Sequence, residues 1–192
     1  MGKRRDFPAL GGESNVTLEE LVEHLGGWRA DTLDTIDLVR AHRDEVRANF
    51  NLLENPNAVL EYLDAFEALF VHVAAELERT TGALSEGHAP STEVADDHAA
   101  ALRQIASNAA AEQRRCLMFR DKWINRPLPH EQVRPLLNRI SIDTRDQLLE
   151  HQKLNLAAGR LVELARGSST PQEADGSFNR RALFTRFLPR RD

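Results

Sequence analysis

Cysteine, tyrosine and long apolar runs are scarce in this chain of 192 residues, which contains one Cys and one Tyr. Because the single cysteine, Cys116, cannot form an internal disulfide, we expect a protein of a reducing compartment, the cytoplasm. No apolar run reaches the length that a membrane-spanning helix needs, and the first residues lack the apolar core of a secretory signal. The sequence therefore predicts neither a membrane span nor export.

The overall composition favours helices over strands. Hydrophobic residues make up 41% of the chain and aromatic residues only 6%, while 29% of the residues are charged. Ala, Leu, Arg and Glu dominate, and long β-branched runs are missing, which is typical of an all-α protein. The formal net charge of −5 gives no general attraction to nucleic acid or to anionic membranes, so neither is expected as a partner.

Four long segments with helical periodicity follow one another, separated by Pro- and Gly-containing breaks. Thr17 and Ser91 have the residue type and position of helix caps, and Pro135 suggests that the last helix starts nearby. The predicted helices cover approximately residues 17–53, 58–81, 91–124 and 130–166. Short connections between helices of this length imply antiparallel neighbours, so we predict an up-down-up-down four-helix bundle.

The ends of the chain differ from this central part. Residues 1–32 are predicted to form a short, partly helical N-terminal extension, and residues 33–166 form the bundle. Residues 167–192 begin with a linker-like stretch, GSSTPQEADGS, and end in a basic segment with interleaved phenylalanines. We expect a flexible tail here, whose residues 178–191 could dock a protein partner.

Each predicted helix carries one histidine on the seam that we expect to face inward, where core positions alternate three and four residues apart. A glutamate, Glu76, follows the second histidine by one helical turn. Counting residues from the predicted connections places the histidines within about one turn of one another along the bundle. Imidazole and carboxylate groups at one level would suit iron or zinc. The histidines are His42, His72, His98 and His151.

Four segments in order resemble the hemerythrin-like, or HHE cation-binding, family. They are IDLVRAHRDEVRANF, FVHVAAELE, ADDHAAALRQI and LLEHQKLNLAAGRLVELAR, spread over residues 36–166. The resemblance implies a hemerythrin-like bundle in which four histidines and two glutamates hold a non-haem di-iron centre. Carried over to this chain, His42, His72, His98 and His151 are terminal ligands and Glu76 is a bridge. The second bridging position holds Asn155 instead of glutamate, which leaves a di-iron pair, a single iron or an empty site open.

These observations predict a binding or sensing protein rather than an enzyme, because no separate cluster of acid, base and substrate-positioning residues is visible. The resemblance implies a non-haem iron site that binds O2 or NO or responds to redox state. A different reading is a metal-free helical interaction module, eroded at Asn155, that acts through its surface and its basic tail. A small redox enzyme and a bis-histidine haem site in the bundle are further alternatives.

Overall fold

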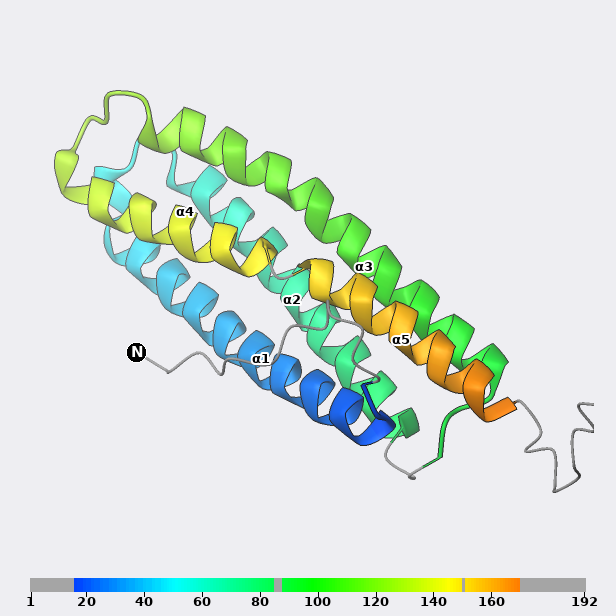
Figure 1. Cartoon of the computed structure of the whole chain (residues 1–192). Helices are drawn as coiled ribbons and strands as arrows, with labels where there is room; N and C mark the ends of the chain where they lie inside the picture. Colours follow the sequence, from blue (N-terminus) through cyan, green and yellow to red (C-terminus); the bar gives the residue numbers. More distant parts are fainter. Residues whose placement is uncertain (1–15, 85–87, 150, 170–192) are drawn as a thin grey trace, which may run out of the picture.

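The computed structural model describes residues 16–84, 88–149 and 151–169, and α-helices dominate them (Figure 1). The described residues contain no β-strand. The main helices are α1 (Leu18–Ala48), α2 (Pro56–Leu84), α3 (Thr92–Phe119), α4 (Arg134–Leu148) and α5 (His151–Ser169). Three short elements lie in the connections: the 3₁₀ helices η1 (Phe50–Leu52) and η3 (Glu131–Val133), and the π-helix η2 (Arg120–Ile124). The predicted all-α helical bundle is therefore confirmed.

The helices start where local hydrogen bonds satisfy their free N–H groups. Thr17 and Glu20 form a reciprocal capping box on α1, with Glu20 N donating to Thr17 Oγ1 at 3.2 Å. Ser91 accepts from Val94 N at the start of α3. Helix α4 has proline in its first turn. The starts predicted from Thr17, Ser91 and Pro135 are therefore confirmed.

Four rods make up the bundle, and α4 and α5 together form the fourth rod (Figure 1). Charged pairs fix the antiparallel neighbours: Arg43 on α1 pairs with Asp64 and Glu67 on α2, and Arg139 on α4 pairs with Glu45 on α1. The α1–α2 and α3–α4 connections lie at the same end of the bundle (Figure 1).

The core of α2 follows a strict three-and-four spacing. Leu63, Phe66, Phe70, Val73 and Leu77 are all buried and continue along one face of the helix. Burial of such side chains supplies the main driving force for packing, at roughly 1.5–3 kcal/mol each. This buried face determines which way every other side chain of α2 points.

Three helix boundaries differ from the sequence prediction. Helix α1 ends at Ala48 instead of near residue 53. It also runs without a break across residue 32, the predicted limit of the N-terminal extension, and Leu21 and Leu25 belong to the core. Helix α2 continues past Gly82 to Leu84. The predicted fourth helix is two helices, α4 and α5, although residues 147–152 contain neither Gly nor Pro. The residues that the structure describes give no physical account of this last break.

Candidate functional site

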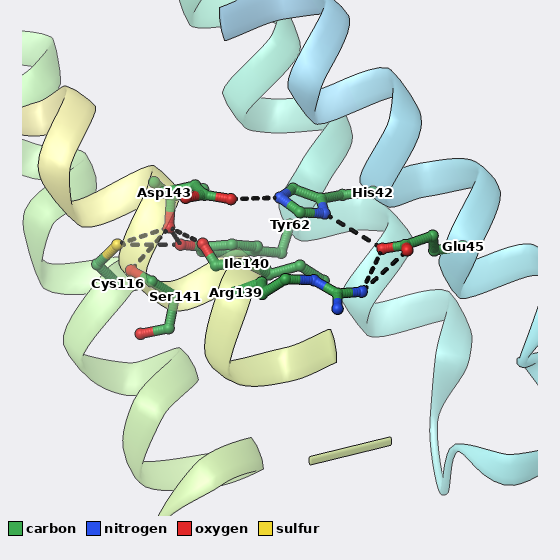
Figure 2. A network of polar contacts seen from close by, with 9 residues as sticks. His42, Glu45, Tyr62, Cys116, Arg139, Ile140, Ser141 and Asp143 are labelled. Carbon is green, nitrogen blue, oxygen red and sulfur yellow. Dashed lines mark hydrogen bonds and ion pairs between the residues drawn. The ribbon is translucent and has the colours of Figure 1, made fainter. Parts of the chain in front are cut away.

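The buried His42 joins α1 to α4 through a carboxylate (Figure 2). Its Nε2 lies 2.7 Å from Asp143 Oδ2, and its Nδ1 lies 3.5 Å from Glu45 Oε2 on the next turn of its own helix. Glu45 in turn accepts two hydrogen bonds from Arg139 at 2.8 and 2.9 Å, and these bonds lower its pKa. His42 therefore sits between two acids: its Nε2 is hydrogen-bonded to Asp143, whereas its buried Nδ1 has only the longer contact with Glu45 and no hydrogen bond among the described residues.

A second set of polar groups continues from this point into the core (Figure 2). Tyr62 Oη lies 3.0 Å from Cys116 Sγ and 2.9 Å from Thr144 Oγ1, and Thr144 donates to the carbonyl of Ile140 at 2.7 Å. Burial raises the pKa of the Tyr62 hydroxyl, and the contact with Cys116 raises it further. The three side chains bridge α2, α3 and α4, so this layer links helices without any exposed reactive group.

The other buried seam histidine, His98 on α3, contacts α2 in a separate place. Its Nδ1 lies 3.1 Å from Thr80 Oγ1 and 3.3 Å from Glu76 Oε1. Arg79 donates to both carboxylate oxygens of Glu76, Nε to Oε2 at 3.0 Å and Nη2 to Oε1 at 2.8 Å. Burial alone would raise the pKa of Glu76, but hydrogen bonds from Arg79 and His98 outweigh it and hold that pKa below its ordinary value.

The predicted inward positions of His72 and Asn155 are wrong, because both side chains are exposed. The predicted inward seam of α2, which contains His72, lies to one side of the face that is actually buried, which contains Phe66, Phe70 and Val73. Glu76 stays buried at the edge of this face, whereas His72 turns towards solvent. His151 begins α5, but its side chain lies outside what the structure describes.

The two buried seam histidines, His42 and His98, also lie at different levels, contrary to the prediction of one shared layer. His42 is next to Arg43, which pairs with Glu67 on α2. Glu76, the partner of His98, follows Glu67 by nine residues, or about 14 Å along the helix. In residues 16–84, 88–149 and 151–169, no group of three or more His, Cys, Asp or Glu could hold a metal ion. The structure therefore does not bring together the five predicted residues whose side chains it describes, and for His151 the metal site stays a prediction.

Sequence reasoning missed the partners of these histidines. Asp143 immediately precedes the buried Thr144, and it reaches His42 from the edge of the buried face of α4. Arg79 follows Glu76 by three residues, which is the spacing of side chains on one helical face. That spacing was a readable signal that Glu76 has a cationic partner.

Comparisons with protein-family models, with curated proteins and with solved structures give no match for this chain. The hemerythrin-like resemblance therefore stays a prediction. No helix among the described residues combines the length and the apolar character needed to cross a membrane.

Proposed function

We propose that this chain is a helical interaction module whose buried histidines connect helices instead of holding iron. The observation that carries the proposal is that each buried seam histidine contacts a carboxylate of a neighbouring helix, in two separate places. His42 contacts Asp143 between α1 and α4, and His98 contacts Glu76 between α3 and α2. Polar groups buried in this way rigidify a core when they are satisfied.

The surroundings of Glu76 argue further against a resident cation. Arg79 occupies both of its oxygens with two hydrogen bonds, the geometry in which arginine holds a carboxylate most firmly. A metal ion would have to displace this guanidinium and would meet its positive charge. The carboxylate of Glu76 therefore already has a cationic partner within the protein, Arg79.

The surface offers large apolar side chains for contact with another protein. Leu117 and Met118, adjacent on α3, are 60% and 68% exposed. Exposed apolar side chains gathered in one place commonly mark interaction surfaces. The basic segment 178–191, predicted to dock a partner, lies outside the described residues.

A single-iron site is the second candidate, and the pair His98–Glu76 favours it. An imidazole nitrogen and a carboxylate oxygen 3.3 Å apart, both buried, are a donor set that iron and zinc accept. In this reading, iron held at His98 and Glu76 would bind O2 or NO, as the hemerythrin-like resemblance implies. The reading requires Arg79 to release Glu76 when iron is present.

Metal analysis of the full chain separates the two candidates. Purified protein is analysed for metal content and visible absorption before and after anaerobic loading with Fe²⁺. The wild type is compared with His98→Ala and with His72→Ala, whose exposed histidine makes it the matched control. We expect no stoichiometric metal in any of the three proteins. Stoichiometric iron that is lost in His98→Ala and kept in His72→Ala would overturn the interaction proposal in favour of the single-iron site.

A photocrosslinking amino acid at position 118 tests the interaction surface directly. It is compared with the same group at position 61, which lies on the exposed face of α2. We expect a discrete crosslinked partner from position 118 and not from position 61. Equal, diffuse crosslinking from both positions would contradict a dedicated contact surface on α3.

A further inference from the structure

A cavity of about 470 Å³ lies at the end of the bundle where the α1–α2 and α3–α4 connections meet. Its walls come from residues 52–55 and from residues in the segment 122–133. Leu52, Trp123, Leu128 and Val133 make much of the lining apolar. The volume is in the range of pockets that bind small molecules, about 300–1,000 Å³. Neither His42 nor His98 takes part in it.

The charged groups at this cavity are unequal in number, and they form no ion pair with one another or with other described residues. Lys122 and Arg126 contribute two positive charges and Glu54 one negative charge. The described residues provide no ion-pair partner for Lys122 or Arg126, and Lys122 Nζ lies 5.2 Å from the centre of the Trp123 ring. The cavity therefore combines an apolar wall with a surplus of one positive charge.

A neighbouring arginine, Arg134, differs from Lys122 and Arg126 because hydrogen bonds within the protein occupy its guanidinium group. Arg134 donates to Glu131 through Nε at 2.7 Å and to the carbonyl of Ile124 through Nη1 at 2.9 Å. These contacts hold the end of the π-helix η2 against the start of α4. Lys122 and Arg126 form no comparable hydrogen bonds with the residues that the structure describes, so within this part of the chain they are available to an external anion.

In the π-helix the aromatic ring of Trp123 is buried, and the neighbouring ammonium group of Lys122 lies exposed over that ring. Asn125 N donates to Arg120 O at 2.8 Å, the wider hydrogen bond of this turn. Trp123 is only 7% exposed, whereas the neighbouring Lys122 is exposed. The indole thus forms part of the cavity wall, and the ammonium group lies at its rim.

From this arrangement we infer that the cavity binds a small amphipathic anion. Its apolar body packs on Trp123 and Leu128, and its carboxylate or other acidic group lies between Lys122 and Arg126. Glu54 opposes the bound charge and limits affinity. The cavity is lined by residues other than Leu117 and Met118, and neither proposal depends on the other.

Octanoate is a suitable probe because 1-octanol provides the same apolar body without the charge. Binding is followed by the fluorescence of Trp123 in the full chain carrying Trp28→Phe, which removes the only other tryptophan. We expect a saturable change with octanoate, weaker binding of 1-octanol, and loss of octanoate affinity as salt is added. Equal affinities for octanoate and 1-octanol, or no saturable signal with either, would overturn the inference.

Charge variants test whether the charged residues at the rim of the cavity contact the bound anion. Lys122→Ala and Arg126→Ala should each weaken octanoate binding about two- to fivefold, the effect of one exposed ion pair, and Glu54→Gln should strengthen it. Arg114→Ala, which removes an exposed arginine of α3 away from the cavity, is the matched control and should change nothing. If Arg114→Ala weakened octanoate binding equally, the effect would come from the net charge of the protein, and the proposed positions of Lys122 and Arg126 at the cavity would be contradicted.

A vesicle arm separates a free anion from a membrane headgroup. Phosphatidylcholine vesicles with and without phosphatidylglycerol are added in place of octanoate, at matched lipid concentration. We expect no change in Trp123 fluorescence with either vesicle. A change that requires phosphatidylglycerol and is abolished in Lys122→Ala would assign the two cations to a lipid surface and overturn the small-molecule site.

Discussion

Asp143 on α4 accepts a hydrogen bond from His42 on α1 across a distance of 2.7 Å, although the two residues are 101 positions apart in the chain. His42 is buried, whereas one third of the Asp143 side chain is exposed. The pair connects the first and last rods of the bundle at the level where Tyr62, Cys116 and Thr144 also meet (Figure 2). A histidine predicted to bind metal thus has a structural partner.

Removing the acceptor should destabilise the bundle. Asp143→Ala leaves the buried Nε2 of His42 without its partner, and we expect the free energy of unfolding to fall by about 1–3 kcal/mol. Asp44→Ala, which removes an exposed carboxylate of α1 that pairs with the exposed Arg47, is the control and should change it by less than about 0.5 kcal/mol. Urea unfolding followed by circular dichroism measures both. Equal effects would contradict the structural role of the pair.

The pair Glu76–Arg79 should make stability depend on pH in the acid range. The folded state lowers the pKa of Glu76 below its ordinary value of 4.5, so the unfolded chain binds the proton more tightly. The stabilisation is therefore complete above the unfolded value and is lost as the pH falls through the lower folded value. We expect the stability difference between the wild type and Glu76→Gln to be constant near neutral pH and to shrink below about pH 4.5.

Unfolding by urea at a series of pH values checks this expectation. Glu61→Gln is the matched control, because Glu61 lies on the exposed face of the same helix. Its stability should follow that of the wild type throughout. A difference between the wild type and Glu76→Gln that grows on acidification would show that the sign assigned to Glu76 is wrong.

The fold was largely predictable because helix periodicity and caps are local signals. The core positions Ala95, Leu102 and Ile105 of α3 are buried as the spacing predicts, and so is His98. The orientation of α2 was not predictable in the same way, because the stretch Leu69–Leu77 has apolar residues on more than one face. Only contacts with the other helices determine which of two overlapping seams faces inward, and these contacts placed His72 outside.

The single cysteine provides a test of the polar layer in the core. Cys116 is 4% exposed and contacts Tyr62 and Thr144, so a thiol reagent should modify it only after local or global opening. We expect slow labelling in the wild type and faster labelling in Tyr62→Phe, which removes one hydroxyl partner. Met118→Cys combined with Cys116→Ser, which presents an exposed thiol, should react at once. Rapid labelling of the wild type would contradict the burial of this layer.

The level of a residue along the bundle was harder to predict than its face. Counting residues from the connections assumed straight helices that end where predicted. In the structure the fourth rod breaks between α4 and α5, the first helix ends at Ala48, and the second continues to Leu84. An error of a few residues in each helix moves a side chain by one or two turns, which is more than a metal site tolerates. For this reason His42 and His98, both correctly predicted as inward, do not meet.

Two glycines inside helices offer a stabilising change that follows from the backbone alone. A Cβ at Gly26 in α1 or at Gly159 in α5 would meet no atom within 4 Å, so alanine fits without strain. Each Gly→Ala substitution should raise the free energy of unfolding by about 0.5–1 kcal/mol, because alanine loses less backbone entropy in a helix. The melting temperature should rise by about 1–4 °C for each, measured by differential scanning calorimetry. Ala30→Gly, at an exposed position one turn after Gly26, should lower it by a similar amount; a loss of stability in Gly26→Ala would show that this turn of α1 is not helical in solution.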